Sequence, residues 1–209
     1  MENLLVLPEK ITIYDNNYAV VKRCFDFVAA LFCIVLFSPL FLIICIVVKL
    51  ADGAPVLFSQ ERVGLHGETF RIYKFRTMTP NAEAEQPLLC DVNDPRLTKV
   101  GQWLRSHHLD EIPQLWNVLK GDMSFIGYRP ERPYFVEQIM EKNPDYARLY
   151  AIRPGITSKA TLYNGYTGTM EKMLRRLDMD LEYLDNQSLM LDIKILLKTF
   201  ISIVSGKLF

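Results

Sequence analysis

The sequence predicts an α+β protein that is mostly helical, in which a re-entrant membrane helix-break-helix carries a small cytosolic domain with a short β-hairpin and interfacial amphipathic helices. Three observations predict this class: an uncharged run from Phe27 to Val48, short β-type stretches between Pro55 and Phe75, and a helix-periodic apolar segment from Leu189 to Leu208. The expected organisation is a lead-in at 1–20, the re-entrant membrane segment at 21–50, the cytosolic domain at 51–186 and a C-terminal interfacial helix at 187–209.

Composition and charge narrow the class of protein further. The 209 residues are enough for one core beside a membrane anchor. Lys and Arg together number 24, as do Asp and Glu, so the net charge of zero argues against a nucleic-acid partner held by overall electrostatic attraction. The mean hydropathy of +0.08 suits a protein that leaves apolar surface in lipid. The four cysteines show no CxxC spacing and are expected to be buried small hydrophobes in a reducing compartment.

The uncharged run from Phe27 to Val48 would extend about 33 Å as a straight helix, enough to cross a bilayer. Ser38-Pro39 lies in its middle, where proline lacks a backbone donor and clashes with the preceding turn, while the serine hydroxyl can satisfy a freed carbonyl. Basic residues flank both ends, Lys22-Arg23 before the run and Lys49 after it, which favours both ends on the cytoplasmic side. We therefore expect a re-entrant helix broken at Ser38-Pro39; a single span with a kink is the alternative.

Two short β-type stretches follow the membrane segment. Pro55–Phe58 and Phe70–Phe75 flank the turn-forming stretch Gly64–Gly67, a pattern typical of a small hairpin. Further along, Asp94-Pro95 is a good helix start, and apolar residues recur after it at spacings of three and four. The sequence therefore predicts a hairpin and then a helix that ends near His107.

The remaining segments are expected to be helical with intervening loops. Asp110–Pro113 should open a helix, because proline is favoured in the first turn and the helix dipole stabilises carboxylates there. Gly121 is suited to close that helix as a cap. Residues 129–155 contain Arg-Pro pairs around a helical segment and predict loop, helix, loop. The segment 189–208 is expected to lie in the membrane interface, with a helix packed in a soluble core as the alternative.

Adjacent carboxylates at a helix start commonly serve only the helix dipole, but the surroundings of Asp110 and Glu111 predict chemistry. Basic residues from separate segments could converge on this helix N-terminus, and we expect them to bind substrate phosphates: Lys74, Arg76, Arg105, Arg129 and Arg132. Nearby guanidinium groups and the dipole should keep Asp110 ionised and ready to attack phosphorus. Asp110 and Glu111 would also supply oxygen ligands to a Mg²⁺ ion that neutralises a pyrophosphate.

A series of motifs resembles the bacterial sugar transferases, also called monotopic phosphoglycosyl transferases, from about residue 20 to the C-terminus. The matching elements, in chain order, are Lys22-Arg23-x-x-Asp26, Ser38-Pro39, Pro55-Val-Leu-Phe-Ser-Gln-Glu-Arg62-x-Gly64, Tyr73-Lys-Phe-Arg-Thr-Met78, Leu104-Arg105, Leu109-Asp-Glu-x-Pro-Gln-Leu-Trp-Asn-Val-Leu119, Gly121-Asp-Met-Ser124, Arg129-Pro-Glu131 and Arg153-Pro-Gly-Ile-Thr157. So many separate motifs in the right order make the resemblance strong, and with one long apolar run the chain looks like a small, minimal member of the family.

The resemblance implies a re-entrant membrane helix, a catalytic pair at Asp110 and Glu111, and Mg²⁺ as cofactor. It also implies a two-step transfer, in which Asp110 attacks a UDP-sugar, releases UMP and carries a phosphosugar that passes to polyprenyl (undecaprenyl) phosphate. Such a reaction initiates assembly of a capsule, exopolysaccharide, O-antigen or glycoprotein glycan at the bacterial inner (cytoplasmic) membrane, with the catalytic domain on the cytoplasmic face. The expected partners are the UDP-sugar, the polyprenyl phosphate and membrane lipid, and a homodimer is left open.

Two other functions are alternatives to phosphosugar transfer, and a few further residues have expected roles of their own. A membrane-anchored, metal-dependent glycosyltransferase would transfer sugar alone and release UDP, and a non-enzymatic hairpin protein would use its arginines only against lipid headgroups. His107 and His108 have no partner at metal-ligand spacing, so we expect structural or substrate-rim roles. Asp192 is expected to form a salt bridge with a basic residue, since a lone charge is costly on an interfacial helix. The sequence assigns Asp180 no role.

Overall fold

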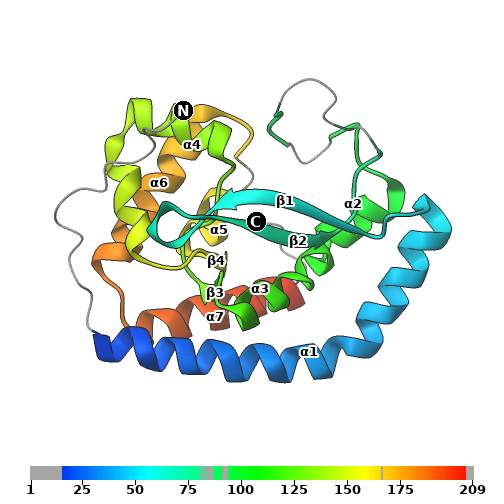
Figure 1. Cartoon of the computed structure of the whole chain (residues 1–209), viewed down its shortest axis with the longest axis horizontal. Coiled ribbons are helices and arrows are strands. Elements are labelled where there is room, and N and C mark those ends of the chain that lie inside the picture. Colours follow the sequence, from blue (N-terminus) through cyan, green and yellow to red (C-terminus); the bar gives the residue numbers. More distant parts are fainter. Residues whose placement is uncertain (1–15, 81, 83–86, 91–93, 166, 206–209) are drawn as a thin grey trace.

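The computed structural model describes residues 16–80, 82, 87–90, 94–165 and 167–205, which are mostly helical with two small sheets. Figure 1 shows a long helix, α1 (Asn16–Asp52), running along one side of a domain built from the residues that follow it. The α+β class is therefore confirmed. Residues 16–20 of the expected lead-in belong to α1, and the rest of the lead-in lies outside the described residues.

Helix α1 bends in its course, as Figure 1 shows. Pro39 lies inside the helix, and the Ser38 hydroxyl donates a hydrogen bond of 2.8 Å to the carbonyl of Val35. Val35 is the residue four positions before Pro39, so this carbonyl is the one that proline, without an N–H, leaves free. The expected serine hydrogen bond is present and the helix bends without interruption, whereas the expected break of a re-entrant helix stays a prediction. Within the part of the chain that the structure describes, α1 is the one helix long and apolar enough to cross a membrane.

Both ends of α1 contact the domain. Near its start, the Arg23 guanidinium donates to the carbonyls of Val118 and Leu119, at 2.7 and 2.9 Å. At its end, the Asp52 carboxylate accepts a hydrogen bond of 2.8 Å from the Thr98 hydroxyl. Between these ends, one side of the helix packs on the domain, whereas its other side is a row of exposed apolar residues that includes Phe25, Val28, Phe32, Val35, Leu42 and Ile46.

The expected hairpin is present. Strands β1 (Leu57–Val63) and β2 (Thr69–Phe75) pair antiparallel, with Leu57 opposite Phe75 and Val63 opposite Thr69. A short 3₁₀ turn, η1 (Leu65–Gly67), connects them, and its His66 and Gly67 both have positive φ. The turn lies where the Gly64–Gly67 stretch predicts it.

The helix after the hairpin, α2 (Lys99–Ser106), ends as expected but starts later than predicted. Asp94, the predicted helix start, accepts hydrogen bonds from the backbone and the side chain of Arg96 instead, a local arrangement that competes with a helix. The cap is Thr98, whose hydroxyl oxygen accepts a hydrogen bond of 2.9 Å from the Gly101 N–H. The prediction of a start at Asp94-Pro95 is therefore wrong by about one turn.

The two carboxylates also lie just before a helix rather than inside its first turn. They belong to a 3₁₀ turn, η2 (Leu109–Glu111), and helix α3 (Gln114–Lys120) begins only after Pro113. Helix α3 ends at Gly121, which has φ 98° and caps it as the sequence predicts. Strand β3 (Ser124–Ile126) follows and pairs in parallel with β4 (Gly155–Thr157).

The rest of the domain is helical around the largest apolar cluster. Between the strands β3 and β4 lie α4 (Pro133–Lys142) and the 3₁₀ segment η3 (Pro144–Ala151), which confirms the predicted loop, helix, loop. Helices α5 (Lys159–Asn164) and α6 (Met170–Asp185) come after β4. The core includes Tyr128, Ile139, Leu149, Tyr150, Leu177 and Leu184.

The last helix, α7 (Leu189–Val204), lies beside the first half of α1 (Figure 1). The Asp192 carboxylate accepts hydrogen bonds from Lys22 (2.6 Å), from Tyr18 (2.8 Å) and from Tyr183 (2.7 Å). The expected salt bridge of Asp192 is thus confirmed, and it joins α7 to α1. Apolar residues of α7 remain exposed beside those of α1, among them Met190, Ile193, Leu197, Phe200 and Ile201.

Candidate functional site

Asp110 and Glu111 lie in η2, between α2 and α3. His108 has φ 54° and turns the chain out of α2 into this 3₁₀ turn. On either side of the two carboxylates, Leu109 and Ile112 pack into a cluster with the second half of α1, which contributes Leu40, Phe41, Ile44 and Val48. The turn that carries the two carboxylates is therefore packed, through its apolar residues, against the part of α1 that follows Pro39.

Glu111 forms ion pairs with two basic residues, Lys74 and Arg129. Its Oε1 lies 2.6 Å from Lys74 Nζ, which comes from β2, and 3.2 Å from a terminal nitrogen of Arg129. Burial raises the pKa of Glu111, but the charges of Lys74 and Arg129 outweigh burial and hold this pKa well below its usual range. Burial also lowers the pKa of Lys74, although the negative charge of Glu111 opposes that shift.

Asp110 is placed differently from its neighbour. Its side chain is 5% exposed, and among the described residues none donates a hydrogen bond to its carboxylate. Burial raises the pKa of Asp110 and the adjacent charge of Glu111 raises it further, whereas Lys74, Arg105 and His108 lower it. The structure thus distinguishes a firmly ionised Glu111 from a more basic Asp110, a distinction that the sequence does not predict.

The structure brings three of the five predicted basic residues to the pair. Lys74 and Arg129 contact Glu111 directly, and Arg105 acts on Asp110 through its charge while it donates hydrogen bonds to Thr77 and Cys90. The substrate contacts expected of these three residues stay a prediction.

The other two predicted residues lie elsewhere. The Arg76 guanidinium donates to the carbonyls of Asp52 and Gly53, the latter at 2.7 Å, and so holds the end of α1. Arg132 immediately precedes α4, with its guanidinium over the ring of Phe135. His107 stacks on Trp103 and bonds the carbonyl of that residue, which agrees with the structural role expected for it.

A buried polar residue supports the site without having been predicted. Asn117, on α3, accepts a hydrogen bond from the Tyr73 N–H at 3.1 Å and donates one to the Arg71 carbonyl at 2.7 Å. These bonds fix α3 against β2 next to Lys74. Their only sequence signal is an amide inside an apolar helix.

Asp180, on α6, is a buried carboxyl to which the sequence assigns no role. Among the described residues, none donates a hydrogen bond to its Oδ1. Burial raises the pKa of Asp180 to about 7, with the charge of Arg176 acting in the opposite direction.

The donor set at the pair fits a magnesium ion that also uses ligands from a substrate. Within the described ranges, no group of three or more His, Cys, Asp or Glu side chains could hold a metal by itself. The Asp110 carboxylate and Glu111 Oε2 accept no hydrogen bond from the described residues. Mg²⁺ is commonly bound by one or two carboxylates together with water and substrate phosphates. The two carboxylates suffice for such a site only when phosphate is present.

Comparison with known proteins gives one consistent result. The family model described as bacterial sugar transferase matches residues 17–206. The chain is 42% identical to a UDP-N-acetylgalactosamine-undecaprenyl-phosphate N-acetylgalactosaminephosphotransferase of Aeromonas hydrophila, over 90% of this chain and 45% of that protein. It is 40% identical to a UDP-glucose:undecaprenyl-phosphate glucose-1-phosphate transferase of Caulobacter vibrioides, over 88% of this chain and 70% of that protein. It is 38% identical to a protein of the same name from Escherichia coli, over 95% of this chain and 43% of that protein. The chain thus spans less than half the length of two of these three relatives.

Proposed function

This chain belongs to the bacterial sugar transferase family, and we propose that it transfers a sugar-1-phosphate from a UDP-sugar to undecaprenyl phosphate through a covalent intermediate on Asp110. The observation that carries the proposal is the geometry of Asp110, a buried carboxylate without a hydrogen-bond donor among the described residues, beside a Glu111 held by Lys74 and Arg129. The names of the relatives support the substrate classes, because they specify UDP-sugars and undecaprenyl phosphate. Those names differ in the sugar, so the proposal does not choose one.

In the first step, a carboxylate oxygen of Asp110 forms a bond to the β-phosphorus of the UDP-sugar. The bond from that phosphorus to the oxygen bridging it to the α-phosphate breaks, and UMP leaves with the electron pair. In the second step, an oxygen of undecaprenyl phosphate attacks the same phosphorus and the Asp110 carboxylate leaves unchanged. The raised pKa of Asp110 makes its oxygen more basic, and hence more nucleophilic once ionised.

The neighbouring residues serve charge and position in both steps. Lys74 and Arg129 hold Glu111 ionised and present positive charge where a transferred phosphate would carry negative charge. Asp110 and Glu111 would hold Mg²⁺, which when bound would neutralise the pyrophosphate. Arg105 stands on the Asp110 side, where its charge favours the carboxylate over the carboxylic acid.

Placement at the membrane follows from α1 and α7. The bend in α1, the contact of both its ends with one domain and its exposed apolar side support a re-entrant helix that enters the membrane and returns. The exposed apolar residues of α7 support its position in the interface. The basic residues at both ends of the apolar run support a position of the domain on the cytoplasmic face of the bacterial inner membrane.

The reaction is tested by product analysis and by trapping the intermediate. Purified enzyme with labelled UDP-sugar and no prenyl phosphate should release UMP and retain a protein-bound phosphosugar. Asp110→Asn keeps the shape of the side chain but should abolish both products, whereas Glu111→Gln should weaken the use of metal and slow both steps. Release of UDP, or label retained by Asp110→Asn, would contradict this reaction. It would favour the alternative, a glycosyltransferase that transfers the sugar without its phosphate and uses Asp110 and Glu111 only to bind a metal.

The topology is tested by single cysteines in a background without the four native ones. Asn17 and Lys49 are exposed positions of α1 on either side of the apolar run. In inner-membrane vesicles of known orientation, cysteines at both positions should react from the same, cytoplasmic side. Opposite accessibility would show that α1 crosses the membrane once.

A further inference from the structure

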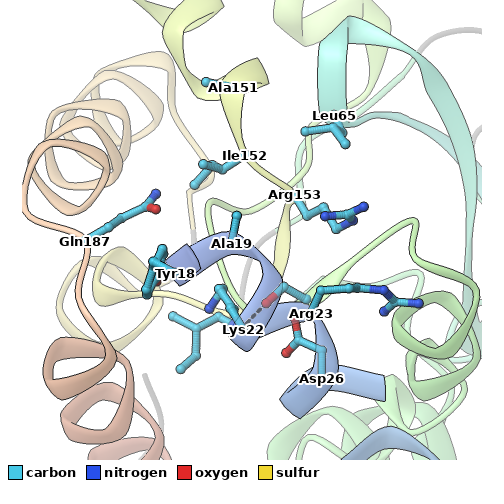
Figure 2. Close-up of a pocket in the computed structure, with 12 residues that line it drawn as sticks. Tyr18, Ala19, Lys22, Arg23, Asp26, Leu65, Ala151, Ile152, Arg153 and Gln187 are labelled. Atoms are coloured by element: carbon cyan, nitrogen blue, oxygen red, sulfur yellow. Dashed lines mark hydrogen bonds between the residues drawn. The ribbon is translucent and has the colours of Figure 1, made fainter. Parts of the chain in front are cut away.

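A cavity of about 80 Å³ lies at the start of α1, away from Asp110 and Glu111. Figure 2 shows its lining: the first turns of α1, the segment that leads into β4, and residues of β3 and η1. This volume is well below the roughly 300 Å³ at which pockets for drug-sized ligands begin. The cavity therefore suits one small group and excludes a whole nucleotide sugar.

Positive charge dominates this cavity. Lys22, Arg23 and Arg153 line it, with Asp26 as the single acidic residue among the lining side chains. Lys22 is already paired with Asp192, a residue outside the lining. Figure 2 shows the side chains of Arg23 and Arg153 extending in the same direction. Two guanidinium groups held together in this way leave a local excess of positive charge.

Hydrogen bonds fix these cations without using all their donors. Arg23 donates through both terminal nitrogens to the carbonyls at the end of α3, and Arg153 donates through Nε to the Gly121 carbonyl at 2.8 Å. Among the described residues, no acceptor bonds the two terminal nitrogens of Arg153. Burial lowers the pKa of Arg153 and the charge of Arg23 lowers it further, while the charge of Asp26 acts in the opposite direction, so a further anion beside Arg153 would favour its charged form.

The position of the cavity indicates the source of the anion. The apolar run of α1 starts at Phe27, immediately after the lining residues of that helix, and the outer side of this end already exposes Val20, Val21 and Phe25. If α1 enters the membrane as proposed above, the cavity lies at the level of the lipid headgroups. Basic residues at this level attract anionic lipids.

We propose that this cavity binds the phosphate group of an anionic membrane phospholipid, with Arg153 and Lys22 as its ligands. The chemistry recognised is a phosphate oxyanion, and the apolar outer side of α1 accommodates the acyl chains. The site rests on the proposed membrane placement but not on the proposed reaction. A bound lipid would fix the start of α1 against the domain through Arg153, which also contacts the end of α3.

The test measures lipid binding to the full chain purified in detergent, by native mass spectrometry and by the rise in melting temperature. Phosphatidylglycerol should bind and raise Tm in the wild type. Arg153→Gln should weaken the apparent affinity about tenfold, because it removes one charge-assisted contact. Arg148→Gln is the matched control, since it removes the same charge from an exposed arginine that pairs with Asp185 outside the cavity. Equal binding by the two variants would overturn the site.

A second variant and a second ligand complete the test. Gln187→Glu adds a negative charge to the cavity lining and removes none of the arginine hydrogen bonds, so it should weaken lipid binding even if Arg153→Gln is unstable. Inorganic phosphate without lipid should raise Tm far less than phosphatidylglycerol does. An equal rise from phosphate, lost in Arg153→Gln, would overturn the lipid as ligand.

The outcome for this site can be separated from that for the reaction. Phosphosugar labelling of the same preparations reports on Asp110 independently. Labelled protein that binds no lipid would refute only the lipid site, and unlabelled protein that binds lipid would refute only the proposed reaction.

Discussion

The buried carboxyl of Asp180 should make the free energy of unfolding depend on pH. Replacing Asp180 by asparagine should remove that dependence. Asp180 is 2% exposed, and the groups that act on its charge are Arg176 and Glu131, while its own charge acts on the hydroxyls of Tyr128 and Tyr146. Burial raises its pKa from 3.8 to about 7 in the folded protein. The folded state therefore keeps the proton over a range of pH in which the unfolded chain has already lost it.

The sign and size of the effect follow from linkage. Because the folded pKa is the higher one, the contribution of Asp180 to stability is greatest below pH 4 and is lost as the pH rises toward 7. A shift of about three pKa units corresponds to about 4 kcal/mol in the free energy of unfolding. Between pH 5 and pH 8 the loss should be roughly 2–3 kcal/mol.

The measurement is the free energy of unfolding of both proteins in detergent at several pH values from 5 to 8. The substitution Asp180→Asn also changes the free energy of unfolding by an amount that does not depend on pH. The prediction therefore concerns only how the difference between variant and wild type changes with pH. Relative to the wild type, the variant should gain roughly 2–3 kcal/mol between pH 5 and pH 8. Asp178→Asn, an exposed position two residues earlier in the same helix, should follow the wild-type curve. Parallel curves for Asp180→Asn and the wild type would show that the buried carboxyl does not hold its proton.

Three further substitutions test the site and the fold. Lys74→Met removes the positive charge that contributes most to lowering the pKa of Glu111. The acid limb of the pH–rate profile should therefore move to higher pH by about one unit or more. If this limb does not move, the reaction does not depend on the ionisation of Glu111. Gly101→Ala would place a Cβ 2.0 Å from the Thr77 carbonyl oxygen, and the free energy of unfolding should fall by about 1–3 kcal/mol; wild-type stability would contradict this close approach. Asp192→Asn breaks the ion pair between α7 and α1, so limited proteolysis should cleave α7 faster than in the wild type; equal rates would show that apolar packing alone holds α7.

Sequence reasoning located the elements whose signals are local. The Gly64–Gly67 stretch predicts the hairpin turn because positive φ favours glycine, and Gly121 predicts the end of α3 for the same reason. Proline at position 39 predicts the kink, since the missing donor is a property of the residue itself. The start of α2 was missed because two local hydrogen-bonding patterns compete there, and Thr98 rather than Asp94 caps the helix.

The sequence predicts the two carboxylates of the candidate site, but only some of the basic residues around them. Five basic residues were possible partners, but sequence spacing cannot tell which side chains a fold turns toward one point. Arg76 follows β2 directly, yet its guanidinium reaches back to the end of α1, whereas Lys74 two positions earlier reaches Glu111. The supporting residue Asn117 acts through backbone groups of a distant segment, so no spacing in the sequence indicates it.

The bend in α1 explains how one small domain can be fixed at two points of a long helix. A straight helix of 37 residues would be about 55 Å long, whereas a domain of about 150 residues is roughly 40 Å across. Because the helix bends, its first half reaches the end of α3 through Arg23, and its second half packs under η2 through Ile44 and Val48. The segment from η2 to the end of α3 is thereby held by α1 at two points. Under the proposed membrane placement, the bend sets where the Asp110 carboxylate lies relative to the membrane, which is the position that the proposed lipid-borne phosphate has to reach.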